Sequence, residues 1–207
     1  MSRAFAESCR IANALDGIVV PGRTDTIIVS EVLGRAGLGS RPELAEAFKR
    51  AYIRCLEEEL PRAPARQGVL PGVVRLLDRL AETSGCTTAL LTGNYLETAR
   101  IKLEHFGLWR YFAFGAFGGD AAERAGLVGV ALARARARGM PDVTSRGVVI
   151  VGDTPLDVAC GQANRTRTLA VATGGAPTDE LTAAGADLVV DDLSDTDAIV
   201  GWLAGRG

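Results

Sequence analysis

The chain has 207 residues, of which 47% are hydrophobic, and its formal net charge is -2. This length and composition suit a sizeable buried core, so a disordered protein is excluded and a large domain with a smaller insert is expected. The nearly neutral charge gives no electrostatic basis for binding nucleic acid or an anionic membrane. No apolar run approaches membrane length, the first residues do not resemble a secretory leader, and the four cysteines are widely separated. These features predict a cytoplasmic protein without a zinc site or a disulfide framework.

Residues 2–60 are predicted to be largely helical. Apolar residues recur at helical spacing in TDTIIVSEVLGRAG and in RPELAEAFKRAYIRCLEEEL, and the turn-rich piece LDGIVVPGRTD lies before them. The segment LPRAPARQGVLPG follows, and its prolines among polar residues are typical of a hinge. We therefore expect a helical domain over residues 1–65 and a second domain over residues 66–207.

After Pro71, helices alternate with short apolar strands. The strands are predicted within residues 86–94, 111–118, 147–153, 168–173 and 186–190. Aliphatic strands that alternate with helices indicate an α/β fold whose parallel sheet is covered on both sides. In open sheets of this kind, ligands bind beyond the carboxyl ends of the strands. The residues that follow each strand are therefore the candidates for a functional site.

Two carboxylates, Asp153 and Asp157, follow the predicted strand GVVIVGD. Asp157 has a structural explanation, because Thr154-Pro155-Leu156-Asp157 fits a helix start in which Thr154 is the N-cap and Asp157 completes a capping box. That explanation does not cover Asp153. A carboxylate at a strand end suits Mg²⁺, which takes one or two carboxylates and leaves room for phosphate oxygens.

Thr92, Gly93 and Asn94 follow the strand within residues 86–94. Thr92 is either the N-cap of a helix that begins near Tyr95, or a hydroxyl that binds an anion together with neighbouring backbone N–H groups. The Thr-Gly-Asn end and the Gly-Asp-x-x-x-Asp end in one sheet are together more specific than either alone, and they favour a phosphate site.

These segments resemble the haloacid dehalogenase (HAD) superfamily, specifically its phosphoglycolate-phosphatase-like branch, over nearly the whole chain. ALLTGN is similar to the family's second motif, in which Thr92 matches the phosphoryl-binding residue. VVIVGDTPLDVACGQAN is similar to the fourth motif, in which Asp153 and Asp157 match the acids that bind Mg²⁺. GRTDTIIVSEVLGRAGL resembles the helical cap of this branch. The resemblance implies a Rossmann-like α/β core with a helical cap over residues 1–65, and Mg²⁺ as the cofactor.

The resemblance also suggests two arginines. Arg124 is the best match by position to the basic residue of the third motif, although the proline that often follows that residue is absent. Arg134 is a poorer match, because Arg136 and Arg138 suggest a solvated helix face. Arg23, in the GRTD turn, is either an exposed turn residue or a cap residue that reaches toward substrate.

The family's first motif, D-x-D-G-T, supplies the nucleophilic aspartate and is not found in this sequence. NALDGIVV imitates its end at Asp16-Gly17, but Ala14 stands in the nucleophile's place and no buried strand precedes it, so a turn is predicted there. In the family this motif ends the central strand, between the strands of the second and fourth motifs. We therefore expect the central first strand to be missing and two strand edges to lack partners. The expected cause is a true start upstream, with Met1 an internal methionine or a misplaced start.

The resemblance implies a Mg²⁺-dependent phosphatase that acts on a small phosphate ester, such as phosphoglycolate, through an aspartyl-phosphate. Its nucleophile would lie outside this chain, which leaves the activity of the chain as written in doubt. Thr92, Gly93 and Asn94 would bind phosphate, and Arg124 would offset negative charge. The expected partner is a small phosphorylated metabolite, and the protein is expected to be a monomer or a homodimer.

Three other interpretations stay open to different degrees. A sugar phosphomutase is possible within the family, because its distinguishing acid would lie in the missing motif. A degenerate HAD domain with a binding role takes the missing nucleophile at face value, but the retained Thr92, Asp153 and Asp157 disfavour it. A Rossmann-type nucleotide binder is weakly supported, because no G-x-G-x-x-G follows the first strand.

Overall fold

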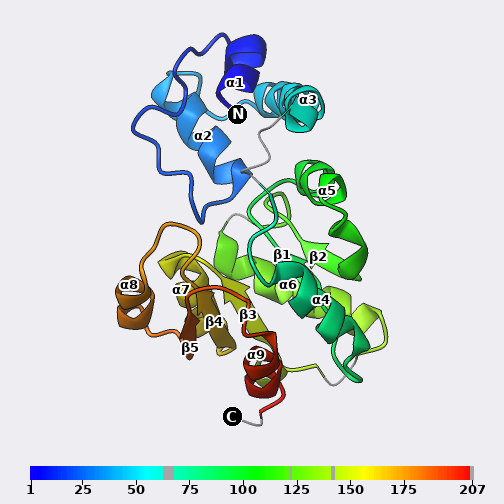
Figure 1. Ribbon diagram of the computed structural model, residues 1–207. Helices are drawn as coiled ribbons and strands as arrows, with labels where there is room; N and C mark the ends of the chain where they lie inside the picture. Colours follow the sequence, from blue (N-terminus) through cyan, green and yellow to red (C-terminus); the bar gives the residue numbers. More distant parts are fainter. Residues whose placement is uncertain (63–67, 122, 141–142, 206–207) are drawn as a thin grey trace.

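In the computed structural model the N-terminal helices form one group beside a core of short strands and helices (Figure 1). The structure describes residues 1–62, 68–121, 123–140 and 143–205. The N-terminal helical unit contains α1 (Ser2–Cys9), α2 (Asp25–Arg35), α3 (Pro42–Glu59) and the 3-10 helix η1 (Leu60–Arg62). The predicted domain boundary at residue 65 lies outside the described residues. Asp16 and Gly17 lie in a turn, as predicted from the sequence.

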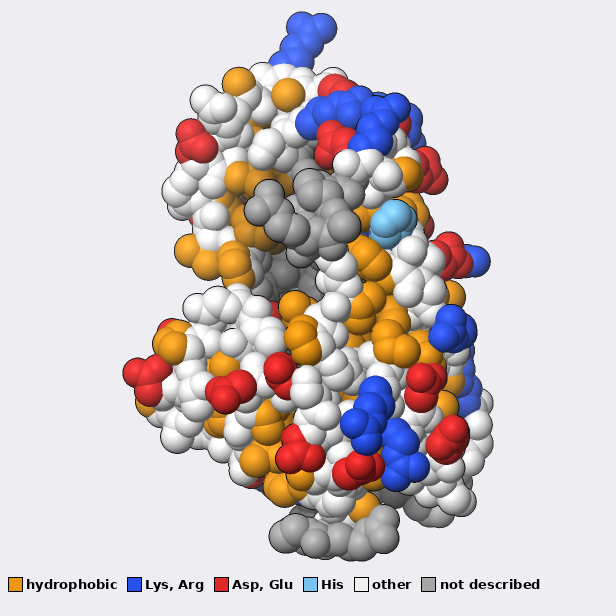
Figure 2. Space-filling view, viewed as in Figure 1, with side chains coloured by type: hydrophobic (Ala, Val, Ile, Leu, Met, Phe, Trp, Pro, Cys, Tyr) orange, Lys and Arg blue, Asp and Glu red, His pale blue; other side chains and the backbone are white. Residues whose placement is uncertain are grey.

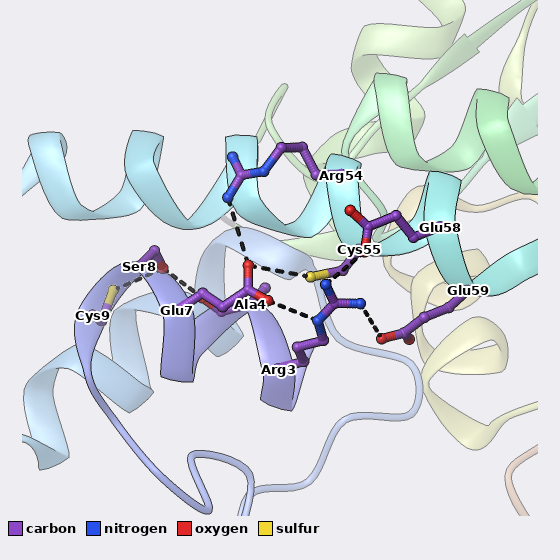
Figure 3. A network of polar contacts seen from close by, with 9 residues as sticks. All are labelled: Arg3, Ala4, Glu7, Ser8, Cys9, Arg54, Cys55, Glu58 and Glu59. Carbon is purple, nitrogen blue, oxygen red and sulfur yellow. Dashed lines mark hydrogen bonds and ion pairs between the residues drawn. The ribbon is translucent and has the colours of Figure 1, made fainter.

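Helix α1 is held on α3 by aromatic packing and by ion pairs. Phe5 and Phe48 are fully buried, and their stacked rings have centroids 4.0 Å apart. Arg3 pairs with Glu58 at 2.5 Å and with Glu59 at 3.2 Å across the two helices (Figure 3). These charged side chains are about half exposed, so each pair adds little to stability. The aromatic pair therefore carries most of the attachment.

Phe48→Ala is expected to destabilise the N-terminal helical unit by about 3–5 kcal/mol, because it removes a fully buried ring and leaves a cavity beside Phe5. Urea unfolding followed by circular dichroism measures the loss. Val19→Ala is the control, since Val19 is 65% exposed and its truncation should change stability by no more than about 0.5 kcal/mol. Equal small losses in both variants would contradict the packing described above.

The core alternates helices and strands, as the sequence predicts. Its helices are α4 (Val73–Glu82), α5 (Leu96–His105), η3 (Trp109–Tyr111), α6 (Arg124–Ala137), η4 (Ser145–Gly147), α7 (Pro155–Asn164), α8 (Thr178–Ala183) and α9 (Thr196–Leu203). Its strands are β1 (Ala89–Leu91), β2 (Phe114–Ala116), β3 (Val149–Gly152), β4 (Arg167–Val171) and β5 (Leu188–Val190). All strand pairs are parallel, which confirms the predicted α/β class. Helix α9 was not anticipated from the sequence.

The strands form two separate sheets, one with β1 and β2 and one with the order β3-β4-β5 (Figure 1). In the described parts of the chain, β1 and β3 each pair with one strand only, so each has an edge without a ladder partner. Helix α6 connects the sheets on one face, where Leu91 and Ile150 belong to a cluster around Val128. On β3, the neighbouring Val151 is 47% exposed. In a parallel sheet, side chains on both faces of a strand are normally buried, so an exposed Val151 is unusual.

The surface is hollowed between the N-terminal helical unit and the core on the face shown in Figure 2. In the core, Leu169 of β4 packs with Leu76 of α4 and Ile199 of α9, and this packing anchors the three-stranded sheet.

Among the described helices, none combines the length and the apolar character needed to cross a membrane.

Candidate active site

The candidate site lies where the loops after β1 and β3 meet the turn before α2. A Cβ atom on Gly22 would lie 2.7 Å from Leu156 Cδ1 and 3.1 Å from Thr154 Oγ1, in the loop after β3 and the start of α7. A Cβ atom on Gly93, after β1, would lie 2.2 Å from the carbonyl oxygen of Arg23. The backbone oxygen beside Gly93 leaves no room for a side chain there, and Gly22 has a φ of +74°, which favours glycine. The turn therefore touches both of the strand ends that the sequence singles out.

Asp153 directly follows β3 and lines a pocket of about 160 Å³ with Gly152, Thr173 and Leu193. Burial raises the pKa of its carboxyl group, and the nearby Asp157 carboxylate raises it further. Within the described residues, no side chain forms a salt bridge with Asp153. Its carboxylate is therefore available to a cation that would compensate its charge.

Asp157 is nearly fully buried and both of its carboxylate oxygens are engaged. Oδ2 accepts hydrogen bonds from the Thr154 N–H at 3.1 Å, the Thr154 hydroxyl at 2.8 Å and the Asp153 N–H at 3.2 Å. The predicted capping box, with Pro155 at the first turn of α7, is therefore confirmed. Oδ1 accepts a short hydrogen bond from Arg124 Nη2. Asp157 thus fixes the loop around Asp153 and places Arg124 beside it.

The two candidate arginines have different positions. The side chain of Arg124 is 19% exposed, and its buried Nε lacks a hydrogen-bond partner among the described residues. Arg134 instead forms a two-pronged pair with Asp120 at 2.6 and 2.8 Å and donates to the carbonyl of Gly115 on β2 at 2.6 Å. The structure therefore brings Arg124, and not Arg134, to the acids after β3.

Thr92 does not cap a helix, so that alternative is wrong. Helix α5 begins at Leu96 with Tyr95 as its N-cap, and no side chain caps it. The Thr92 hydroxyl accepts a hydrogen bond from the Asn94 N–H at 3.2 Å. Asn94 receives a bond from Lys102 Nζ at 2.8 Å on its Oδ1. The loop after β1 is thus held by Thr92 and Asn94, which the sequence indicated, and by Lys102, which it did not.

Arg23 has its guanidinium group engaged within the N-terminal helical unit. Its Nη1 lies 2.7 Å from a Glu31 carboxylate oxygen and donates to the carbonyl of Val19 at 3.0 Å. The hydrogen bond from Arg23 lowers the pKa of Glu31, to which Arg35 also contributes. The carbonyl of Arg23, and not its side chain, lies against Gly93.

The fit of a Mg²⁺ ion depends on Asp153. No cluster of three or more His, Cys, Asp or Glu side chains that could hold a metal occurs among the described residues. Mg²⁺ is often held by one or two carboxylates and completes its shell with water and phosphate oxygens. The free carboxylate of Asp153 fits that requirement, whereas Asp157 would have to release Arg124 to ligate directly.

The sequence pattern of the family described as haloacid dehalogenase-like hydrolase matches residues 15–162. The chain belongs to this family. The match contains every candidate residue discussed above, from Arg23 to Asp157, and the parallel α/β core agrees with it.

Several solved structures share the fold of this chain. A hydrolase from Pseudomonas syringae is 20% identical with a TM-score of 0.67, over 96% of this chain and 91% of that one. A predicted phosphoglycolate phosphatase from Haemophilus somnus is 16% identical with a TM-score of 0.61, over 96% and 92%. A β-phosphoglucomutase from Clostridium difficile is 18% identical with a TM-score of 0.67, over 98% and 87%. No curated protein matches the chain.

Proposed function

We propose that this HAD-family chain contributes the cap and most of the core of a Mg²⁺-dependent phosphatase that acts on a small phosphate ester such as phosphoglycolate. The observation that carries the proposal is the free Asp153 carboxylate beside the Arg124–Asp157 pair, at the end of β3. An uncompensated acid next to a tightly held arginine is costly for stability and is typical of a functional site.

Each residue has a distinct role in the proposed reaction. Asp153 holds Mg²⁺, which when bound neutralises charge on the phosphoryl oxygens. Arg124, oriented by Asp157, offsets negative charge on the same oxygens. The Thr92 hydroxyl and the Gly93 N–H, in the loop that ends at Asn94, bind the remaining phosphate oxygens. The turn at Gly22 closes over both loops and limits the size of the ester.

The nucleophilic aspartate belongs, in this proposal, to a strand encoded upstream of Met1 that inserts between β1 and β3. Two features support this proposal. In the described chain, β1 and β3 each have an edge without a partner strand. Val151 of β3 is also 47% exposed, which is unusual for a strand of a parallel sheet. In addition, the chain matches 87–92% of the three solved structures, so each of them contains residues with no counterpart here. A parallel strand at this place would join the two sheets into one.

The experiment is a Mg²⁺-dependent hydrolysis assay with an aryl phosphate, run on this chain and on a protein extended by the codons upstream of Met1, called the extended protein below. We expect no activity in the chain as written and activity in the extended protein. Loss of activity with EDTA and its return with Mg²⁺ test the cofactor. Activity in the chain as written, or upstream codons without an in-frame aliphatic strand ending in D-x-D-G-T, would refute the missing-nucleophile proposal.

Two alternatives give other outcomes in the same assay. A sugar phosphomutase would transfer phosphate between positions of a sugar phosphate faster than it releases inorganic phosphate, a possibility supported by the similarity to the β-phosphoglucomutase fold. A non-catalytic binding domain would bind Mg²⁺ and phosphate and remain inactive even when extended.

A further inference from the structure

A buried polar cluster joins the N-terminal helical unit to the loop after β1. Asp25, the first residue of α2, is 2% exposed. Its Oδ2 accepts a hydrogen bond from the Tyr95 N–H at 2.9 Å, and its Oδ1 accepts one from Asn94 Nδ2 at 3.5 Å. Its own N–H donates to the carbonyl of Gly93 at 2.7 Å. A single residue of the N-terminal helical unit thus contacts three consecutive residues of the loop.

Lys102 of α5 completes this cluster from the opposite side. Its Nζ donates to Asn94 Oδ1 at 2.8 Å and lies 5.7 Å from the centroid of the Tyr52 ring on α3. Burial lowers the pKa of Lys102, and the negative charge of Asp25 opposes that shift. Burial likewise raises the pKa of Asp25, and the Tyr95 N–H opposes it. The charges of the buried Asp25 and the partly buried Lys102 therefore compensate each other across Asn94.

The start of α2 does not by itself require this carboxylate. Thr24 already caps the helix, because its Oγ1 accepts a hydrogen bond from the Ile27 N–H at 3.3 Å. An acidic side chain in the first turn is stabilised by the helix dipole even when it is exposed to solvent. The dipole therefore does not explain why Asp25 is buried. A buried carboxylate is costly unless hydrogen bonds satisfy it, and here those bonds come from another part of the fold. The next residue, Thr26, also reaches the core, where its hydroxyl donates to the carbonyl of Gly118 at 2.6 Å.

We infer that Asp25 is a positioning residue for the phosphate-binding loop Thr92–Tyr95, and that it makes the geometry of this loop depend on the seating of the N-terminal helical unit. This inference rests on the proposed function. Asp25 fixes the side chain of Asn94 and the N–H of Tyr95, while the N–H of Asn94 is directed at the Thr92 hydroxyl. Release of Asp25 frees the loop, so that the Thr92 hydroxyl and the Gly93 N–H are no longer held in the positions that bind a phosphate.

The test compares phosphate binding and amide exchange in variants of the chain. Isothermal titration with inorganic phosphate and Mg²⁺ is expected to show roughly tenfold weaker binding for Asp25→Ala, as is usual when a group that orients a ligand-binding residue is removed. Asp25→Asn should recover most of the affinity, because its side-chain oxygen still accepts from the Tyr95 N–H. Hydrogen exchange followed by NMR should show faster exchange at Tyr95 in Asp25→Ala only. Lys102→Met keeps Asp25 but removes the donor to Asn94, and should weaken binding in the same direction.

Asp187→Ala is the matched control. Its carboxylate also accepts a backbone N–H, that of Thr168 at 2.7 Å, but in the connection between β4 and β5. This variant should lose stability without a change in phosphate affinity. Unchanged Tyr95 exchange in Asp25→Ala, or an equal affinity loss in Asp187→Ala, overturns the inference. If neither the unaltered chain nor the extended protein binds phosphate, the proposed function fails, while selective faster exchange at Tyr95 in Asp25→Ala still upholds the positioning by Asp25.

Discussion

Asp153→Asn is expected to remove most of the Mg²⁺-dependent phosphatase activity of the extended protein and, at the same time, to make its fold more stable. The substitution keeps the shape of the side chain, which lies against Gly174, where a Cβ atom would come within 1.8 Å of Asp153 Oδ2. It removes the carboxylate after β3, which forms no salt bridge within the described residues. We expect a loss of roughly a hundred- to a thousandfold in kcat/KM, the size found when a group that stabilises transition-state charge is deleted.

The gain in stability follows from the raised pKa of Asp153. Its folded pKa lies above the unfolded value of 3.8, first because of burial and then because of Asp157. The folded state therefore holds the proton more tightly, and the stabilisation from this proton is complete below pH 3.8 and is lost as the pH rises through the folded pKa. At neutral pH the ionised group destabilises the protein, and asparagine should restore about 1 kcal/mol.

Urea unfolding in the presence of EDTA, at neutral pH and again below the unfolded pKa, measures this gain. The difference between Asp153→Asn and the unaltered protein should vanish at the lower pH, where both carry a neutral side chain. Asp187→Ala is the control, because it removes a carboxylate oxygen that accepts two hydrogen bonds from Thr168 and should lower stability while activity remains. A variant Asp153→Asn that loses both activity and stability would point to a structural role.

The sequence predicted the parts of this fold that depend on local pattern. All five strands lie in or within one residue of the predicted segments, since short apolar runs bounded by turn residues are a strong local signal. The capping box at Thr154 and Asp157 was readable for the same reason. The strands of the second and fourth motifs lie in two separate sheets, and the missing strand between them stays a prediction.

The rest could not be predicted because it depends on contacts between distant segments. Asp25 is buried only because residues 70 positions later supply its hydrogen-bond donors. Thr92 was assigned a capping role as one alternative, but the chain needs three further residues before α5 begins, so its hydroxyl accepts from the Asn94 N–H instead. Arg23 was a candidate for substrate contact because it lies in a turn, but its guanidinium group pairs with Glu31 of α2 instead. For Asp25 a partner far along the chain set the outcome, whereas for Thr92 and Arg23 the local course of the backbone decided which nearby group each side chain meets.

Val151→Thr should be almost neutral in this chain and clearly destabilising in the extended protein. In the chain the Val151 side chain is 47% exposed, so replacing a methyl group by a hydroxyl group should change stability by no more than about 0.5 kcal/mol. A strand inserted beside β3 would place a residue next to Val151 on the same face of the sheet. The hydroxyl group would then be buried without a partner, at a cost of about 1–3 kcal/mol.

Ile150→Thr is the matched control on the same strand. Ile150 is 6% exposed and packs with Val128 of α6 on the opposite face, so this variant should be destabilised in both proteins. Urea unfolding of the two variants in both backgrounds gives four values that separate the effect of the inserted strand from the effect of a threonine in β3. A Val151→Thr cost that is the same in the chain and in the extended protein would mean that the upstream residues do not cover β3. Asp153 directly follows β3, so a strand that does not pair with β3 could not place its nucleophile beside Asp153 in the proposed way. The nucleophile would then have to come from another part of the fold.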